Sequence, residues 1–403
     1  MSKKNTAPRL GNSMSSVGSL LASFTCIALG LIIGFIALLV LGWITLAQEG
    51  STLSFADMLA NTWNSGFKAI LTGGFYTTAN AKGMGVRAEI LQAAPLIMTG
   101  LSVAFAFKTG LFNIGAAGQY TVGAYFGLYC AIVLKMPWWL CLIASAVGGA
   151  LWGAIPGIFK AFLNVNEVIT AIMFNWIGLY GVNTLIYQAG TGVMYNPNTT
   201  KTYTIKQASP ESLLPTFNFQ VGGKDYFGAL FLPTIGIFLA IAVAVVVWII
   251  LNKTTFGYEL KACGHNKNAA KYAGINDKKN IILSMTIAGA LAGLGAGLYY
   301  LSGSKEWEPL VSTALPAAGF NGISVALLAS SDPLGCIFSA LFIAHITIGG
   351  GFMDASIFPG EVSDIISGVV IYLCAFSLLF KTAITKFFAG KPKAAESGKE
   401  AKG

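Results

Sequence analysis

Long apolar runs separated by short polar segments make up most of this 403-residue chain. The runs cover residues 21–47, 88–107, 119–134, 138–160, 166–188, 229–251, 280–301, 319–330, 334–350 and 359–380. A helix of about 20 residues crosses the roughly 30 Å hydrocarbon core of a bilayer. The pattern therefore predicts an all-α integral membrane protein with about ten transmembrane helices.

Composition supports a membrane location and narrows the choice of partners. Hydrophobic residues make up 55% of the chain and charged residues only 10%, which is too apolar for a soluble domain of this length. The net charge of +9 comes from basic residues spread over loops and tails without an aromatic-interleaved patch, so no nucleic-acid partner is expected. With six Cys, no C-x-x-C pair and only two His, no metal site is expected.

The distribution of Lys and Arg predicts the orientation, because positive charge near span ends is retained on the cytoplasmic side. Most of the 25 basic residues fall on that side when the N-terminus lies inside the cell. The run 21–47 lacks an Ala-x-Ala exit and is too long for a signal-peptide core, so we expect an additional N-terminal transmembrane helix. The remaining segments are cytoplasmic tails at 1–20 and 386–403 and external segments at 48–87 and 189–228.

Two of the polar segments have features of their own. The mixed stretch 55–70 predicts a short interfacial helix in the first external segment, and the Pro-rich 189–228 predicts a structured cap or loop. The Lys-rich loop 253–279 lies on the cytoplasmic side of the predicted topology. Its spacing of apolar residues predicts a short amphipathic helix ended by Gly274, which suits a helix stop because it lacks a Cβ. An ordinary loop that retains topology has the same composition, and the sequence leaves both interpretations open.

Two segments of similar sequence stand far apart in the chain: GLFNIG at 110–115 and GFNGI at 319–323. The first follows a run that crosses inward, and the second follows one that crosses outward. Transporters are often built from inverted repeats that meet near the membrane midplane, and broken helices are tolerated there when they line a cavity or lie inside protein. We therefore expect two inverted-repeat halves, spans two to five and seven to ten, with broken or re-entrant helices.

Several amides and a few acids interrupt the apolar runs. Glu167 follows Asn166 at the inner start of a span, where Asn caps a helix and an acid is favoured by the helix dipole, so we expect a cytoplasmic gate or helix cap there. Amides in a span either line a pathway or hydrogen-bond across helices, and the sequence does not separate the two. The candidates for the translocation pathway are Asn113, Gln119, Asn175 and Asn321.

The sequence contains no recognisable source of transport energy. The phosphate-binding pattern Gly-x-x-x-x-Gly-Lys-[Ser/Thr] does not occur, so any ATP must be hydrolysed by a separate subunit. An ion-coupled secondary carrier is an alternative, but it needs a coupling-ion site, and the runs hold few acids. His345 is a lone titratable group in its run, which favours a hydrogen-bonded packing role. A purely structural membrane protein would need no polar interruptions of its spans. We expect a transport subunit with no catalytic residues.

Three stretches carry a family resemblance: GLFNIGAAGQ at 110–119, NEVI at 166–169 followed by Asn175, and FGYELKACGHNKNAAKYAGI at 256–275. They resemble the membrane permease subunits of ATP-binding-cassette (ABC) importers in the branch that serves branched-chain amino acids, ribose-like sugars and nucleosides. The third stretch is similar to the coupling-helix loop that docks into the ATPase. The first departs from the family in having Ala117 where an acidic residue is typical, which leaves the role of that position open.

The resemblance implies a permease core at 88–385, most similar to the larger of two permeases in bacterial nucleoside importers, with a simple-sugar permease as the alternative. It implies alternating access driven by ATP and Mg²⁺ in a partner ATPase, with no cofactor in this chain. The implied partners are that ATPase, a second permease in a heterodimer, an extracytoplasmic solute-binding protein and the bacterial plasma membrane. The residues implied in coupling to the ATPase are Glu259, Gly264, Asn266, Ala269, Ala270 and Gly274.

Overall fold

The computed structural model describes residues 10–48, 54–75, 84–189, 193–216, 220–221, 224–225, 234–309, 314–358, 361–376 and 382. The α-helices are α1 (Leu10–Gln48), α2 (Phe55–Asn61), α3 (Lys68–Thr72), α4 (Met84–Lys108), α5 (Ala116–Ile132), α6 (Trp138–Leu163), α7 (Glu167–Thr184), α8 (Ile205–Ala208), α9 (Ile235–Lys253), α10 (Thr255–His265), α11 (Lys267–Tyr272), α12 (Asp277–Tyr300), α13 (Ala317–Leu328), α14 (Pro333–Gly350) and α15 (Glu361–Ala375). Shorter elements are the π-helical η1 (Thr62–Phe67) and η3 (Leu185–Ala189), the 3-10 turns η2 (Gly73–Phe75) and η4 (Pro210–Ser212), and the strands β1 (Tyr195–Asn196), β2 (Lys201–Thr202), β3 (Gln220–Val221) and β4 (Lys224–Asp225).

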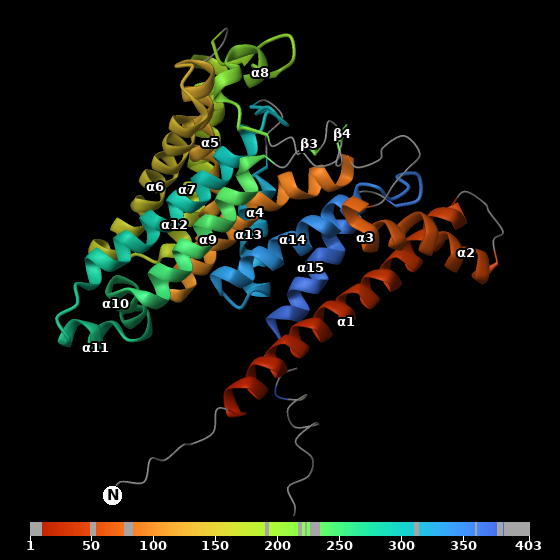
Figure 1. The fold of residues 1–403 in the computed structure, drawn as a ribbon, viewed down its shortest axis with the longest axis horizontal. Coiled ribbons are helices and arrows are strands. Elements are labelled where there is room, and N and C mark those ends of the chain that lie inside the picture. Colours follow the sequence, from red (N-terminus) through yellow and green to blue (C-terminus); the bar gives the residue numbers. More distant parts are fainter. Residues whose placement is uncertain are drawn as a thin grey trace, which may run out of the picture.

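Every predicted apolar run overlaps a helix, so the structure is mostly helical, as predicted, with two short two-stranded sheets in addition (Figure 1). Within the described residues, seven helices are long and apolar enough to cross a bilayer: α1, α4, α6, α7 continued by η3, α9, α12 and α14. The other three, α5, α13 and α15, have 17, 12 and 15 residues. At 1.5 Å per residue α13 is only about 18 Å long, too short to cross the hydrocarbon core. Of the about ten predicted spans, seven are therefore long enough to cross a bilayer in the described residues.

The core of the bundle is held together by close helix packing around α4, which contacts α5, α9, α12, α13 and α14. Helices α6 and α12 approach each other most closely, through Gly149 and Gly153 on one side and Gly289 and Gly293 on the other. A Cβ atom on Gly153 would lie 2.9 Å from the Cα of Gly289. Small residues permit this approach in a membrane, where packing replaces the hydrophobic effect as the main attraction between helices. The glycines of α6 and α12 therefore serve helix packing.

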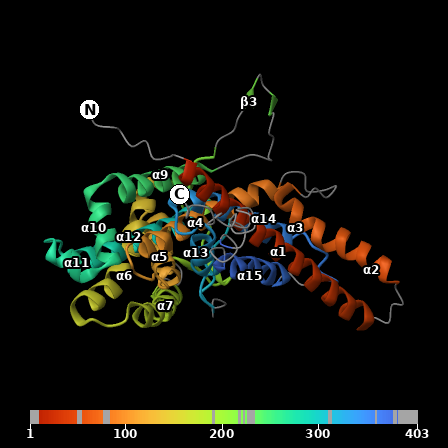
Figure 2. The ribbon, with the colours of Figure 1, turned by 90° about the horizontal axis from the view of Figure 1, so that it is seen from below.

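An N-terminal extension, residues 10–75, lies beside α14 and α15 (Figures 1 and 2). Helix α1 packs along α15, where Gly34 faces Ile366. The helical turns from Phe55 to Thr72 follow one another directly, which confirms the helix predicted at 55–70. Residues 10–20 were expected in a tail but are helical, because the 39-residue α1, about 58 Å long, continues beyond its apolar stretch.

The side chains of His345 on α14 and Glu89 on α4 join this extension to the core. His345 Nδ1 lies 3.2 Å from Glu89 Oε1, and Nε2 lies 3.0 Å from the carbonyl oxygen of Leu71. The N–H of Gly74 donates to Glu89 Oε2 at 2.9 Å. The hydrogen-bonded packing role predicted for His345 is therefore confirmed, and its acidic partner comes from a distant helix.

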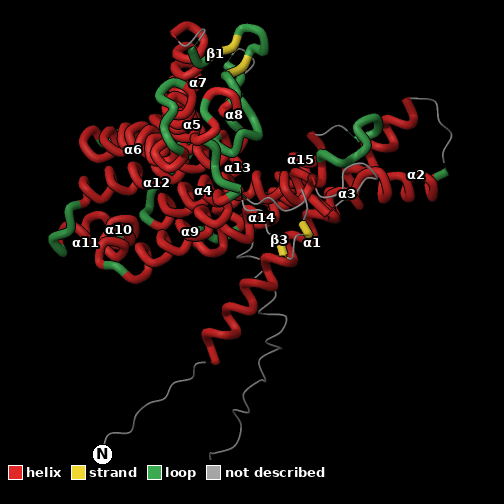
Figure 3. The backbone as a smooth tube through the Cα atoms, turned by 45° about the horizontal axis from the view of Figure 1, so that its top comes forward, coloured by secondary structure: helices red, strands yellow, loops and turns green. Residues whose placement is uncertain are grey.

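A cap formed by residues 193–216 lies at the opposite end of the bundle from α10 and α11 (Figures 1 and 3). Strands β1 and β2 pair antiparallel, and the N–H of Thr202 donates to the carbonyl oxygen of Trp307 at 2.9 Å. Lys201 Nζ lies 2.7 Å from Glu308 Oε1, and this hydrogen bond and charge raise the pKa of Lys201. The cap predicted in 189–228 is thus present in its described part. Residues 1–9 and 386–403 of the predicted tails lie outside the described residues.

Candidate functional site

The Lys-rich loop 253–279 folds into two short helices, α10 and α11, separated by one residue. Asn266 adopts an extended conformation, ends α10, and accepts a hydrogen bond from the N–H of Ala269 at 3.0 Å through its side chain. An Asn at this position satisfies a backbone donor that the first helical turn leaves free. Gly274 has a φ of 81° just after α11, a conformation that favours glycine, so the predicted helix stop is confirmed.

One face of this two-helix loop packs against the bundle. Leu260 and Ala270 are buried, and Asn280 Nδ2 on α12 donates to Glu259 Oε2 at 3.5 Å. Gly264 also faces the bundle, because a Cβ atom there would lie 2.5 Å from the carbonyl carbon of Thr109. Five of the six residues implied in coupling therefore either face the protein itself or shape the loop, rather than presenting a side chain outward: Glu259, Gly264, Ala270, Asn266 and Gly274.

The opposite face of the loop carries two strongly exposed aromatic residues. Tyr272 is 95% exposed and Tyr258 is 70% exposed, and Ala269 is exposed beside them on α11. Aromatic side chains are enriched at protein interfaces and dominate the binding energy of many of them. The sequence analysis did not single out either tyrosine, although aromatic residues in a polar, Lys-rich segment were a usable signal.

The loop contacts the break in the chain between α4 and α5. Gly264 and Gly110 pack backbone to backbone, and Gly110, with a φ of 76°, turns the chain at the end of α4. The neighbouring Thr109 hydroxyl is hydrogen-bonded to the hydroxyl of Ser284 on α12. Movement of α10 would therefore act directly on residues 109–115, the non-helical segment that leads into α5.

Three of the four predicted pathway amides are already hydrogen-bonded to other groups of the protein around that segment. Asn113 Nδ2 donates to Gln119 Oε1 at 2.8 Å and to Ser102 Oγ at 2.9 Å, and Gln119 Nε2 donates to Asn113 Oδ1 at 3.0 Å. Asn175 Oδ1 accepts from the N–H of Gly118 at 2.8 Å. All three amides are at most 2% exposed. The helix-bonding interpretation left open by the sequence accounts for these contacts.

Asn321, the fourth amide, lies elsewhere: it lines a cavity of about 400 Å³ between α4, α5, α12 and α13. Gln92 on α4 lines the same cavity, and neither amide has a hydrogen-bond partner among the described residues. The first residues of α13, Ala317 and Ala318, also face the cavity, and no side chain caps that helix end. A helix start without a cap leaves backbone N–H donors free for another acceptor.

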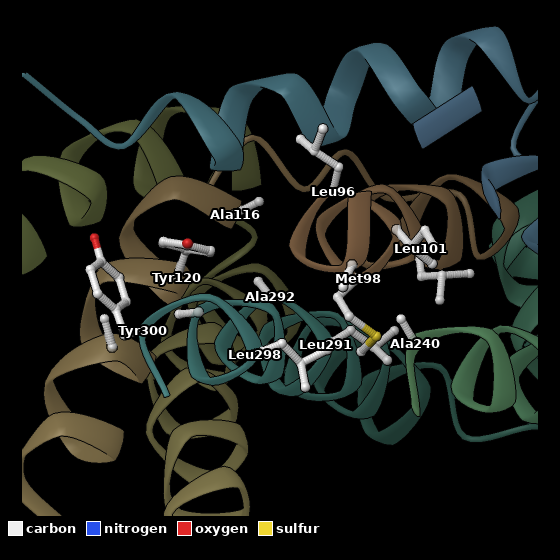
Figure 4. Close-up of a cluster of buried hydrophobic side chains, with 14 of the residues drawn as sticks. Leu96, Met98, Leu101, Ala116, Tyr120, Ala240, Leu291, Ala292, Leu298 and Tyr300 are labelled. Carbon is white, nitrogen blue, oxygen red and sulfur yellow. The ribbon is translucent and has the colours of Figure 1, made fainter. Parts of the chain in front are cut away.

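Aromatic rings form one wall of this cavity. The rings that line it are those of Tyr120, Tyr299, Tyr300 and Trp307. The ring centroid of Tyr300 lies 6.3 Å from that of Tyr120 and 5.7 Å from that of Trp307. Figure 4 shows Tyr120 and Tyr300 at one end of the buried hydrophobic cluster, away from Ala240 and Leu101. The Trp307 ring is held by α7, because its Nε1 donates to Asn183 Oδ1 of that helix at 2.8 Å. The cavity therefore has a rigid aromatic wall beneath the cap.

Sequence reasoning missed most of this cavity. Gln92 stands in an apolar run, and the Tyr299-Tyr300 pair ends another, so both were visible as unusual positions. Trp307 carried no such signal, because its place depends on how the loop after α12 folds back. The rim adds Lys305, Glu306 and Glu308, which the sequence analysis did not single out.

The predicted cap and gate pair lies at the start of α7. Asn166 Oδ1 accepts from the N–H of Val168 at 2.9 Å, which confirms the capping geometry. Glu167 Oε2 lies 2.8 Å from Lys160 Nζ near the end of α6. This ion pair lies beside a smaller cavity of about 260 Å³, lined by Lys160, Thr109 and Gly264. The gate role itself stays a prediction.

Comparison with known proteins places this architecture in a transport family. A family model described as "Branched-chain amino acid transport system / permease component" matches residues 87–375. The guanosine ABC transporter permease protein NupP of Bacillus subtilis is 35% identical over 91% of this chain and 96% of its own length. The nucleoside ABC transporter permease protein NupB of Lactococcus lactis is 36% identical over 77% of this chain and 84% of its own length.

A third relative differs in its named substrate. The glucose ABC transporter permease protein TsgB13 of Haloferax volcanii is 30% identical over 74% of this chain and 77% of its own length. No solved structure matches the chain. The chain belongs to this permease family: it is the multi-pass membrane permease component of an ABC importer. As such it is a transport subunit without a cofactor of its own, and it works with an ATPase and a solute-binding protein.

Proposed function

We propose that this chain forms the path by which nucleosides cross a bacterial plasma membrane. The observation that carries the proposal is the cavity wall of Tyr120, Tyr299, Tyr300 and Trp307, because aromatic rings stack on a planar base. Its similarity to guanosine and nucleoside permeases supports the same substrate class. A sugar presents hydroxyl groups around its whole ring, and the few free polar groups of this cavity suit it less well.

The proposed coupling mechanism runs through α10 and α11. Tyr258 and Tyr272, with Ala269 between them in the chain, dock against the ATPase, while Ala270 and Glu259 fix the loop to the bundle. Asn266 and Gly274 set the angle and end of α11. Gly264 passes the displacement to the Gly110 turn, and so to α5.

The three amides that are hydrogen-bonded inside the protein position the backbone in this proposal. Asn113, Gln119 and Asn175 hold the 109–118 segment in one arrangement, and breaking or remaking their hydrogen bonds accompanies the switch between outward and inward access. Asn321 contacts solute directly. The Asn166–Glu167 start of α7, with Lys160, closes the cytoplasmic side.

The assembly follows from the same proposal. Both termini and the loop 253–279 are cytoplasmic, and the cap faces the solute-binding protein. In this proposal the second permease is a different chain and the smaller of the two, and this chain is the larger because it carries the described helices of 10–48 and 54–75 ahead of the family match at 87–375. In this proposal GLFNIG at 110–115, which precedes α5, and GFNGI at 319–323, in the first turns of α13, are the matching segments of two inverted-repeat halves, and the short helices α5 and α13 are their re-entrant helices.

The test is to co-express the chain with its ATPase, second permease and binding protein, purify the complex in mild detergent, and measure guanosine uptake in cells. We expect Tyr272→Ala with Tyr258→Ala to lose the ATPase and uptake together. Tyr129→Ala, an exposed tyrosine on α5 away from the loop, is the matched control and should keep both. A well-folded wild-type chain that retains no ATPase would rule out the coupling mechanism.

A further inference from the structure

The cavity that carries the proposed function also contains the groups needed to recognise one part of its substrate. We propose that it is a nucleobase-binding station: the base lies against the ring wall of Tyr299 and Tyr300, and its edge is read by the amides of Gln92 and Asn321. This inference rests on the proposed function and deepens it by assigning a site within this single subunit. It adds a claim about chemistry: the base, not the ribose, is what the cavity selects.

Size and shape are the first step. Small-molecule sites are concave and usually range from about 300 to 1,000 Å³, and this cavity of about 400 Å³ suits one nucleoside. Tyr299 and Tyr300 stand nearly perpendicular to each other, with centroids 5.2 Å apart and an interplanar angle of 84°. Two rings in this arrangement form a corner, so a flat base can lie against one face while its edge meets the other ring.

The free amides are the second step. An Asn or Gln side chain presents one donor and one acceptor side by side, and this pair matches the neighbouring donor and acceptor on the edge of a base. Asn113, Gln119 and Asn175 cannot serve in this way, because the core already uses their groups. Gln92 and Asn321 have no partner among the described residues, and both line the cavity. The Tyr120 hydroxyl likewise makes no hydrogen bond within the described residues.

The charged rim is the third step, and it sets a limit on the ligand. Glu306 and Glu308 stand beside Lys305, and Glu308 is already paired with Lys201 from the cap. Lys201 neutralises Glu308 and Lys305 balances Glu306, so the rim carries no net charge that would attract a phosphate. Ribose hydroxyl groups can instead donate to a carboxylate such as Glu306. The site therefore favours a neutral nucleoside or a free base over the nucleotide.

The experiment measures initial uptake rates of radiolabelled guanosine by cells that express the complete transporter, with variants of this chain. Tyr300→Leu should lower the maximal rate on the order of 5- to 100-fold, the factor that corresponds to loss of one base-stacking contact. Gln92→Leu and Asn321→Leu should each lower it severalfold. The concentration for half-maximal uptake should stay unchanged, because the binding protein captures the solute first.

Three controls keep the readings separate. Tyr300→Phe retains the ring and should transport nearly as well as wild type, and Tyr129→Leu, on α5 outside the cavity, should be silent. Thermal unfolding of each purified complex identifies any variant that fails to fold. The partly exposed Asn321 has no partner to lose, so its variant reports on the site even if Tyr300→Leu misfolds.

Stimulation of ATP hydrolysis by added compounds tests which part of the substrate the cavity selects. The complexes are reconstituted without the binding protein, so that each compound must act on the permease itself. Free guanine and guanosine should stimulate, whereas ribose and guanosine monophosphate should not. Equal stimulation by ribose, or wild-type transport by Asn321→Leu, Gln92→Leu and a folded Tyr300→Leu, would overturn the base-binding station and leave the proposed function intact. No guanosine uptake by the assembled wild-type transporter would instead overturn the proposed function.

Discussion

The segment before α5 and the first turns of α13 carry the same Phe-Asn dipeptide, yet they have opposite polar environments. Asn113 is fully buried, and its amide bonds to Gln119 and Ser102. Asn321 is partly exposed to a cavity and has no hydrogen-bond partner among the described residues. The neighbouring phenylalanines differ too: Phe112 stacks on Phe107 at 5.0 Å, whereas Phe320 is 38% exposed.

This difference separates two uses of an amide in an apolar bundle. A buried amide must have its groups bonded, since each unsatisfied group costs about 1 to 3 kcal/mol, so a closed network specifies one arrangement of the backbone. An amide that faces a cavity is compensated by water or by a ligand, and its stability contribution to the fold is small. We call the bonded surroundings of Asn113 the closed region and the cavity side of Asn321 the open region. Substitutions in the closed region should affect folding, and substitutions in the open region should affect transport.

The contact between the two regions should be the most sensitive position. Gly319 on α13 packs directly on the backbone of Ala117 on α5, and any Cβ would overlap it. Gly319→Leu should destabilise the protein by about 3 kcal/mol or more, because the two helix starts cannot separate without opening the core. Gly181→Leu, which has nothing within 4 Å of its Cβ position, is the control. The yield of folded protein in mild detergent is the measurement, and equal yields would contradict this account.

The paired substitution Asn113→Leu and Asn321→Leu tests the comparison itself. The first leaves Gln119 and Ser102 short of partners and should lower the free energy of unfolding by about 2 to 3 kcal/mol. The second should change it by less than about 0.5 kcal/mol while reducing uptake. Equilibrium denaturation in detergent and uptake in cells measure the two effects. Similar stability losses for both variants would show that the open and closed regions do not differ in this way.

Ser102→Ala should have an intermediate effect on stability. The Ser102 hydroxyl donates to the carbonyl oxygen of Ala288 on α12 at 2.6 Å and accepts from Asn113. Its loss should cost about 1 kcal/mol. Because both residues belong to one network, the double variant with Asn113→Leu should lose less than the sum of the single losses. Strict additivity in the double-mutant cycle would mean that no network exists.

The smallest effect is expected at the start of α7. Glu167→Gln removes the 2.8 Å ion pair with Lys160, whose side chain is 27% exposed against 14% for Glu167, so solvent weakens the pair. The loss should be below about 1 kcal/mol, whereas Asn166→Ala removes the helix cap and should cost about 1 kcal/mol. Denaturation of both variants ranks them. A larger loss of stability for Glu167→Gln than for Asn166→Ala would contradict this ranking and show that the ion pair stabilises the fold more than the helix cap does.

Features that depend on near neighbours in the chain followed directly from the sequence. The apolar runs became helices, Asn166 caps α7, and Gly274 stops α11 with a positive φ, because capping and helix termination involve residues only a few positions apart.

Only the tertiary structure decided which polar groups are free. Asn113 and Asn321 each follow a phenylalanine in the sequence. The helices packed around each determine whether its side-chain amide is hydrogen-bonded within the protein or faces a cavity. The direction of Gly264, the pairing of His345 with Glu89, and the gathering of Gln92, Tyr120, Tyr300 and Trp307 around one cavity all join residues far apart in the chain. Local sequence carries no record of such distances, because the partner of a side chain is set by how whole helices pack.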